Sequence, residues 1–432
     1  MPLYFASMRV LLLVIALAVI QITSAIAQTP PAAQAIVLQP DRVFDGERNQ
    51  AGWVVVVRGD RIEAAGPAGS TPAPAGARTI VLTGTTLMPG MIEGHSHLLL
   101  HPYNETVWND QVLREPLALR VARATNHARA TLMAGITTVR DLGTEGAGYA
   151  DVGLRQAISE GIIPGPRMLV AGPAMVVTGS YAPKGFAPEV SVPQGAEEAD
   201  GLDGVMRVAR GQIAHGVDLI KIYADYRWGP NGETRPGFTL EEIQRIVQAA
   251  NSSGRPVVAH SSTPEGMRRA IMGGVETIEH GDEGTPEIWK LMVEKNVAYC
   301  PTIAAGDATA QYAGWKKGVD PEPARIARKR ETFKAALAAG VKMCFGGDVG
   351  VYAHGDNVRE LELMVDWGMT PAAALVAATS GNAAYFRQGE RIGRVKAGLF
   401  ADLIGVEGDP SSSVKALRQV KFVMKGGKVF KE

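Results

Sequence analysis

Short apolar runs alternate with longer amphipathic stretches through the centre of the chain. The apolar runs predict eight strands, at residues 87–97, 136–140, 167–171, 219–223, 256–260, 276–280, 298–302 and 342–348. Helix-like stretches lie between them, at residues 113–133, 197–215, 240–251, 264–272 and 324–339. Strands separated by helices over roughly 300 residues match a (β/α)8 TIM barrel. An open doubly wound sheet is the alternative, although no Gly-x-Gly-x-x-Gly motif follows the first central strand.

Both ends of the chain show short β-type runs separated by turn residues. These runs lie at residues 35–38, 53–57, 61–65 and 79–82, and again at 399–406 and 420–430. Gly59 followed by Asp60 is a hairpin signal. We therefore expect an α/β protein in which residues 28–83 and 386–432 form one small β-sandwich beside a barrel over residues 84–385.

The N-terminus carries the pattern of a secretory signal peptide. Arg9 precedes an apolar run over residues 10–20, and Ala25 and Ala27 form an Ala-x-Ala cleavage site. The pattern predicts a signal peptide over residues 1–27 and export to the periplasm or the medium. An uncleaved membrane anchor is the alternative, but the apolar run is short for a span. After cleavage we expect no attachment to a membrane.

The positive and negative side chains of this protein are equal in number. Lys plus Arg and Asp plus Glu both number 44, and no basic run with interleaved aromatic residues occurs, so nucleic acid is not expected as a partner.

Two cysteines, Cys300 and Cys344, are too few for a disulfide framework. Both lie in apolar, strand-like contexts, which favours buried thiols. A bridge between them stays open if their strands are neighbours.

Polar residues with metal-binding chemistry recur where the predicted strands end. His95 and His97 are two residues apart on an extended segment, so their imidazoles face the same side and suit a divalent metal. Functional residues of a barrel lie at the carboxyl ends of its strands. The polar residues found at or near the ends of the predicted strands are His95, His97, Lys221, His260, His280 and Asp348.

Each of these residues has a simpler explanation on its own. A lone His260 or His280 after an apolar run is more often a core histidine, and Asp348 can merely cap the next helix. Lys221 is more telling, because an ammonium between two isoleucines is costly to bury unpaired. Taken together, the set indicates a metal centre.

Four segments carry a resemblance to a known family. Residues 89–97, 134–143, 381–384 and 392–403 are similar to the first-strand motif, the second strand and the return segment of the amidohydrolase superfamily of metal-dependent hydrolases. The resemblance covers nearly all of the mature chain. It is nearest to the branch of imidazolonepropionase-like proteins and exported prolidase-like or Xaa-Arg dipeptidases, which includes ochratoxin-hydrolysing amidohydrolases.

The resemblance implies a binuclear centre with two divalent metal ions, expected to be zinc. His95, His97 and Asp348 would hold the more buried metal, and His260 and His280 the more exposed one. Lys221, carboxylated by CO2 on its side-chain nitrogen, would bridge them as a carbamate. A neutral lysine amine that adds CO2 becomes an anion, which explains how lysine serves as a ligand.

The expected mechanism follows from this arrangement. Two cations lower the pKa of a bridging water, so that hydroxide is available near neutral pH. Asp348 is the expected general acid/base, which passes a proton to the leaving amine. Tyr223, two residues after Lys221, faces the same side and is a catalytic candidate for oxyanion stabilisation, with packing at the barrel mouth as the alternative.

Substrate residues are less well defined by the sequence. The loop after the fourth strand holds Tyr226 and Arg227, and Arg227 offers a bidentate partner for a substrate carboxylate, with a solvated loop arginine as the alternative. Relatives often carry Gly-Gly-His after the third strand, where this chain has Gly179, Ser180 and Tyr181. That departure affects the substrate and leaves the metal chemistry intact.

The leading hypothesis is an exported amidohydrolase that cleaves a dipeptide or N-acyl amino acid, including ochratoxin-like amides. A cyclic-amide hydrolase or deaminase of the imidazolonepropionase-like type is the alternative, and export together with Lys221 argues against it. A non-catalytic solute-binding protein is disfavoured because a binder needs no general base. Relatives are commonly multimeric, so a homo-oligomer is expected.

Overall fold

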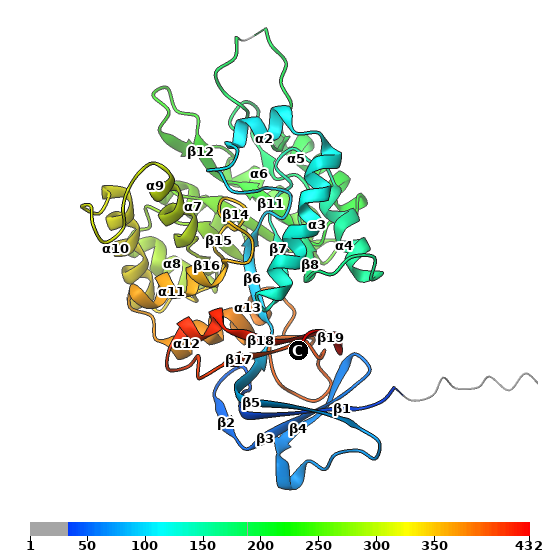
Figure 1. Cartoon of the computed structure of the whole chain (residues 1–432). Helices are drawn as coiled ribbons and strands as arrows, with labels where there is room; N and C mark the ends of the chain where they lie inside the picture. Colours follow the sequence, from blue (N-terminus) through cyan, green and yellow to red (C-terminus); the bar gives the residue numbers. More distant parts are fainter. Residues whose placement is uncertain (1–32, 188) are drawn as a thin grey trace, which may run out of the picture. The chain divides into compact units, whose positions relative to one another are not determined.

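Figure 1 shows the computed structural model, which describes residues 33–187 and 189–432. Residues 35–432 belong to a single unit. The signal peptide predicted over residues 1–27 lies outside the described residues. Within the described part of the chain, no helix is long and apolar enough to cross a membrane.

Strands from both ends of the chain pair in one eight-stranded sheet, in the order β19-β18-β17-β5-β1-β3-β4 with β2 beside β1. Strand β5 joins the two ends, because it runs parallel to β1 and antiparallel to β17. The strands are β1 (Ile36–Phe44), β2 (Asn49–Ala51), β3 (Trp53–Arg58), β4 (Arg61–Pro67), β5 (Arg78–Pro89), β17 (Leu403–Glu407), β18 (Val420–Lys425) and β19 (Lys428–Lys431).

The four valines of β3 explain why this sheet has two apolar faces. Successive side chains of a strand point to opposite faces. Val55 and Val57 accordingly pack with one buried cluster, while Val54 and Val56 pack with another. The sequence predicts a small β-sandwich built from both chain ends, and strands from both ends pair in this one hydrogen-bonded sheet.

The central region carries two parallel sheets. One has the order β6-β7-β8 and the other β10-β9-β11-β14-β15-β16. Every residue of β7 and β11 is buried, as expected for parallel strands covered on both faces. The strands are β6 (Met91–Ser96), β7 (Ile136–Asp141), β8 (Arg167–Val170), β9 (Met175–Val176), β10 (Glu197–Glu198), β11 (Ile220–Tyr223), β14 (Val257–Ser261), β15 (Thr277–His280) and β16 (Ala298–Cys300).

Backbone contacts connect the two parallel sheets. The Asp218 amide donates to the Val170 carbonyl at 2.7 Å, which joins the end of β8 to the start of β11. Parallel bridges pair Tyr299 with Met343 and Ser96 with Val349. The segment from residue 343 to 349 thus runs from β16 back to β6.

That segment is the predicted eighth strand, and it is irregular. It forms bridges at its two ends and no continuous ladder. Gly346 lies so close to β6 that an added Cβ would stand 3.0 Å from the His95 amide nitrogen. Asp348 adopts a positive φ of 63°, which no regular strand has. Close packing and this backbone turn prevent a regular strand here.

Helices follow the strands in chain order, which makes this an α/β fold (Figure 1). The predicted helix over residues 113–133 is two helices, because Pro116 separates α2 from α3. The helices are α2 (Trp108–Arg114), α3 (Leu117–Met133), α4 (Ala150–Ser159), α5 (Gly201–Ala214), α6 (Leu240–Asn251), α7 (Pro264–Gly273), α8 (Pro286–Lys295), α9 (Ile303–Tyr312), α10 (Ala324–Ala338), α11 (Val358–Asp366), α12 (Pro371–Val376) and α13 (Asn382–Tyr385).

Cys300 and Cys344 form a disulfide, where the sequence favours buried thiols. The bridge between Tyr299 and Met343 places the two cysteines on neighbouring segments, with their Cα atoms 4.5 Å apart. This separation lies in the range that a disulfide spans. The pairing depends on a contact between residues 44 positions apart, which local sequence does not reveal.

Candidate metal centre

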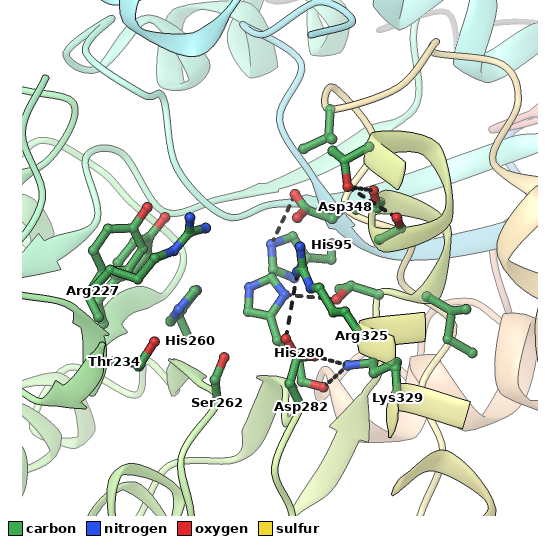
Figure 2. Close-up of a pocket in the computed structure, with 18 of the residues that line it drawn as sticks. His95, Arg227, Thr234, His260, Ser262, His280, Asp282, Arg325, Lys329 and Asp348 are labelled. Atoms are coloured by element: carbon green, nitrogen blue, oxygen red, sulfur yellow. Dashed lines mark hydrogen bonds and ion pairs between the residues drawn. The ribbon is translucent and has the colours of Figure 1, made fainter. Parts of the chain in front are cut away.

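The six predicted ligands lie at the carboxyl ends of the parallel strands. His95 belongs to β6, Lys221 to β11 and His260 to β14, and His280 is the last residue of β15. His97 directly follows β6, and Asp348 lies next to His97. A cavity of about 440 Å³ opens at this end, and every predicted ligand except Lys221 lines it (Figure 2). Lys221 is 1% exposed and lies beneath the cavity wall.

His95, His97 and Asp348 form the tightest group. One ligand atom from each lies within 4.8 Å of the others. Asp348 Oδ1 is 3.2 Å from His97 Nε2 and 3.6 Å from His95 Nε2. Two imidazole nitrogens and a carboxylate oxygen are a common donor set for a divalent cation.

His260 and His280 adjoin this group. Their rings are 4.3 Å apart, and the ring of His280 is 5.1 Å from that of His95 (Figure 2). Lys221 Nζ lies 5.7 Å from the ring of Tyr223. Among the described residues, no carboxylate lies within 4.0 Å of Lys221 Nζ, so this buried amine is not held as an ion pair.

Three of the imidazoles are oriented by hydrogen bonds from Nδ1. The acceptors are Glu279 Oε2 for His95 (2.9 Å), the Gly143 carbonyl for His97 (2.8 Å) and Thr302 Oγ1 for His280 (2.8 Å). A neutral imidazole that donates from Nδ1 keeps the lone pair of Nε2 free. Metal-binding histidines are held in this way. The donor set therefore fits a divalent metal.

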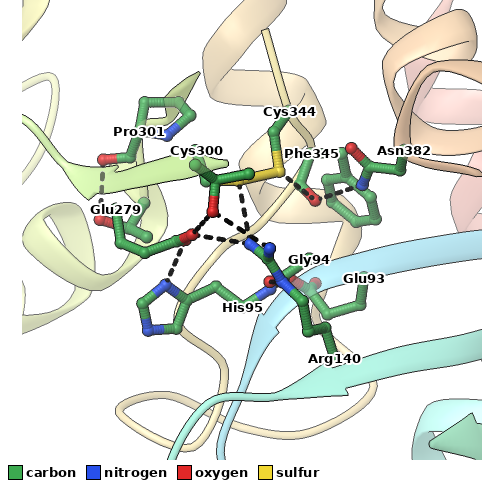
Figure 3. Close-up of a disulfide and its surroundings, with 12 residues drawn as sticks. Glu93, Gly94, His95, Arg140, Glu279, Cys300, Pro301, Cys344, Phe345 and Asn382 are labelled. Carbon is green, nitrogen blue, oxygen red and sulfur yellow. Dashed lines mark hydrogen bonds and ion pairs between the residues drawn. A yellow bond between two sulfur atoms is a disulfide. The ribbon is translucent and has the colours of Figure 1, made fainter. Parts of the chain in front are cut away.

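Glu279 is itself fixed by a buried arginine. Arg140 Nη2 donates to Glu279 Oε1 at 2.7 Å, and the side chains are 3% and 0% exposed. Arg140 also donates to the Gly94 carbonyl at 2.7 Å and contacts Cys300 Sγ at 3.4 Å (Figure 3). The disulfide, Arg140, Glu279 and His95 thus form one connected buried cluster.

Backbone strain is concentrated at the cavity. Four of the six non-glycine residues with positive φ in the described chain line it: Glu145 (51°), His280 (75°), Thr302 (52°) and Asp348 (63°). Such conformations cost roughly 1–3 kcal/mol each and persist where the surrounding structure enforces them. The strain directs the Asp348 and His280 side chains into the cavity.

Burial keeps most of the imidazoles neutral. It lowers the pKa of His260 to about 3, with help from the Lys221 charge, and it lowers the pKa of His95 and of His280 well below the usual value. His97 differs: burial lowers its pKa, but the hydrogen bond and charge of Asp348 outweigh this and raise the pKa to about 9. The negative charge of Asp348 therefore favours a positive charge on or beside His97.

The pKa values of Asp348 and Lys221 are also displaced. Burial raises the pKa of Asp348, but the charges of His95, His97 and Lys221 prevail and the net pKa is lowered. Burial lowers the pKa of Lys221 to about 8. More of the amine is then neutral near neutral pH, and the neutral form is the one that adds CO2.

Tyr223 lies beside the predicted ligands. Its ring stacks on that of His260 at 4.4 Å, and its hydroxyl donates to Glu145 Oε1 over a long 3.4 Å. Tyr181 and Tyr226 pack edge-on against each other at 4.8 Å. Both of these predicted substrate residues line the cavity with Tyr223.

Arg227 lies at the exposed mouth of the same cavity (Figure 2). The loop that holds it is a hairpin of β12 (Asp225–Arg227) and β13 (Thr234–Pro236), where the sequence predicts an irregular loop. The Arg227 carbonyl accepts from Lys184 Nζ at 2.7 Å, which ties the hairpin to the loop after β9.

Glu145 is a residue that sequence reasoning missed. It is 2% exposed, lines the cavity, and lies with Oε1 3.9 Å from His97 Nδ1. Its Oε2 accepts from Trp108 Nε1 at 2.8 Å and from the Tyr181 hydroxyl at 2.5 Å. Glu145 follows the second central strand, so the strand-end rule that selected the six ligands also applies to it.

The comparisons with known proteins agree with this geometry. A model described as Amidohydrolase family matches residues 86–430. Ochratoxinase from Aspergillus niger is 29% identical over 376 residues, which cover 80% of this chain and 75% of that protein.

Two solved structures are also similar. A Xaa-Pro dipeptidase with bound methionine in the active site has a TM-score of 0.80 and 29% identity, and the match covers 92% of this chain and all of the other. A prolidase complexed with N-methylphosphonate-L-proline has a TM-score of 0.80 and 28% identity, with the same coverage. These relatives and the matched family model indicate a hydrolase acting on C–N bonds. The chain belongs to the amidohydrolase family, in the branch that holds ochratoxinase and prolidase-like enzymes.

Proposed function

We propose that this protein is an exported, binuclear metal-dependent amidohydrolase that cleaves the amide bond of a dipeptide or N-acyl amino acid, ochratoxin-like amides included. The observation that carries the proposal is the convergence of His95, His97 and Asp348 on one point, with both imidazoles oriented by outer partners. Export rests on the sequence pattern of residues 1–27.

A closed barrel would bring the proposed ligands together at one end of the strands. The two parallel sheets supply seven of its strands, counted as β6, β7, β8, β11, β14, β15 and β16. The bridged segment from residue 343 to 349 supplies the eighth position, and its bridges at Tyr299 and Ser96 lie on its two sides. We propose that these strands form a (β/α)8 barrel, which brings their carboxyl ends together.

The residues divide into two sets of ligands. His95, His97 and Asp348 would hold one divalent ion, expected to be zinc, and His260 and His280 the other, with a carbamate on Lys221 between them. When bound, two such ions supply hydroxide near neutral pH and polarise a substrate carbonyl. Lys221 has no ion-pair partner among the described residues, and this together with its lowered pKa supports carboxylation of its Nζ.

Asp348 is placed to move the proton of the reaction. Its lowered pKa keeps the carboxylate ionised near neutral pH, ready to accept the proton of the attacking water. The leaving amine then takes that proton from the same carboxyl. The Tyr223 hydroxyl, which interacts with Tyr181 and donates to Glu145 over a long 3.4 Å, would turn toward the carbonyl oxygen and donate to it.

The cavity carries opposite charges for the two ends of a dipeptide. Arg227 at the mouth offers a partner for the substrate carboxylate. Within the described residues, no Lys or Arg side chain lies within 4.0 Å of the Glu145 carboxylate, although it is buried. In addition to its hydrogen bonds from Trp108 and Tyr181 and its contact with His97, this carboxylate can pair with a substrate ammonium. Glu145 therefore favours a dipeptide with a free amino group over an N-acyl amino acid.

The test is a substrate screen on the zinc-loaded enzyme. Dipeptides and N-acyl amino acids are supplied as matched pairs that differ only in the free amino group, and released amino acid is measured. We expect turnover of dipeptides, with the N-acyl partner slower. Failure across the library, together with turnover of a cyclic amide or an aminated ring, would overturn the proposal.

A further inference from the structure

A second cavity lies at the opposite ends of the strands from the metal centre. Its volume is about 530 Å³. It is lined by Arg167 at the start of β8 and by Asp218 and Arg255, which precede β11 and β14. Arg391 and Lys425, from the C-terminal part of the chain, complete its polar wall. The proposed hydrolysis uses none of these residues.

The charges of this cavity do not balance. Its lining contains five cationic side chains, those of Arg155, Arg167, Arg255, Arg391 and Lys425, against one acidic side chain, Asp218. Arg155 pairs with Asp218 at 2.5 Å. Arg167 forms two hydrogen bonds with Asp402, at 2.6 Å and 3.1 Å.

The remaining three cations have only neutral partners. In the described ranges, no carboxylate oxygen lies within 4.0 Å of Arg255, Arg391 or Lys425. The acceptors are the Val217 carbonyl for Arg255 Nε (2.6 Å), Gln388 Oε1 for Arg391 Nη1 (3.3 Å) and the Gly165 carbonyl for Lys425 Nζ (2.5 Å). Arg255 and Lys425 are half-buried and Arg391 is exposed, and these contacts do not neutralise their charges.

The cations of this cavity lie close enough to one another to affect the pKa of Lys425. Burial, aided by the charge of Arg167, lowers the pKa of Lys425 to about 8, as expected where cations crowd together.

We propose that this cavity binds a small organic anion bearing a phosphate or carboxylate group, held by Arg255, Arg391 and Lys425. Guanidinium and ammonium groups recognise such oxyanions. A volume of about 530 Å³ accommodates an organic molecule larger than free phosphate. The site lies outside the metal centre, so the ligand is an effector or a second bound molecule and not the hydrolysed substrate.

Calorimetric titration of the metal-loaded protein with inorganic phosphate and with succinate, at low ionic strength, tests the proposal. Phosphate also binds metals, so the comparison uses variants. We expect the double variant Arg391→Gln/Lys425→Met to weaken binding of the preferred anion by about tenfold or more. Lys290→Gln, which removes an exposed lysine of α8, is the matched control and should bind as the unmodified protein does. Tighter binding of either probe supports the proposal and identifies the recognised group.

A crystal soaked in selenate locates the anion by anomalous scattering. We expect a peak between Arg391 and Lys425 that is absent from the double variant. Unfolding temperatures of the variants show whether each is folded. No measurable binding by either probe, equal affinity in a folded double variant, or an adventitious ion only, seen at crystal concentrations and not in solution, would overturn the proposal.

Discussion

Replacement of Glu279 by glutamine tests how the buried cluster controls the metal centre. The carboxylate accepts from Arg140 at 2.7 Å through Oε1 and from His95 Nδ1 at 2.9 Å through Oε2. A glutamine side chain has one carbonyl oxygen and one NH2 group, so it can accept from only one of these donors and turns a donor toward the other. It also leaves Arg140 buried without a counter-charge.

The expected loss of stability follows from the missing hydrogen bond and the missing counter-charge. A hydrogen bond to a charged group contributes about 1.5–3 kcal/mol, and removing one partner of a buried ion pair costs about 3–5 kcal/mol. We expect the free energy of unfolding to fall by about 3 kcal/mol. Mutation of a residue that hydrogen-bonds to a metal-binding histidine typically lowers metal affinity by about 10- to 100-fold. The zinc affinity of Glu279→Gln should therefore fall by about this factor.

The assay combines urea unfolding of the metal-free protein with a zinc titration against a chromophoric chelator. Asp402→Asn is the matched control, because it breaks the partly buried pair with Arg167, which lies away from the metal centre. The control should lose stability and keep its zinc affinity. If Glu279→Gln is folded and binds zinc as tightly as the unmodified protein, Glu279 does not position His95 and the reasoning is refuted.

Three further predictions address single residues. Lys221→Ala should lose most of the hydrolytic activity and recover part of it when short carboxylic acids are added; full activity without rescue would exclude the carbamate. Glu145→Gln should raise KM for dipeptides by about tenfold or more and leave that for N-acyl amino acids unchanged, whereas Glu287→Gln on the surface of α8 should alter neither. Burial raises the pKa of Glu360 to about 8, so the folded protein holds this proton more tightly than the unfolded chain does, and the associated stability is lost as the pH rises from about 4.5 to about 8. Scanning calorimetry at pH 5 and pH 8 should therefore show a smaller drop in Tm for Glu360→Gln; an unchanged drop would contradict the assignment.

Local sequence pattern was sufficient to predict most strands of the central region, but not the irregular backbone of residues 343–349 or the hairpin of β12 and β13. His95, Lys221 and His260 lie in strands that were predicted from apolar runs, because parallel strands are buried on both faces. The positive φ of His280 and Asp348 had no such signal, since no local pattern marks a strained backbone. Such conformations are imposed by the surrounding packing.

Contacts between distant residues account for what was missed. The Cys300–Cys344 disulfide depends on the bridge between their neighbours, 44 residues apart in the chain. Glu145 accepts from Trp108 at the start of α2, from Tyr181 in the loop after β9 and from Tyr223 at the end of β11. Residue types alone do not show that three aromatic donors and a carboxylate meet.

The most direct test of the binuclear hydrolase is zinc reconstitution of the chelator-treated protein. Bound zinc is counted by mass spectrometry, while the release of an amino acid from the best dipeptide is measured at each addition. We predict no turnover without metal, and turnover that rises until two zinc ions are bound per chain. Full turnover of the metal-free protein, or a plateau at one bound zinc, would contradict the account.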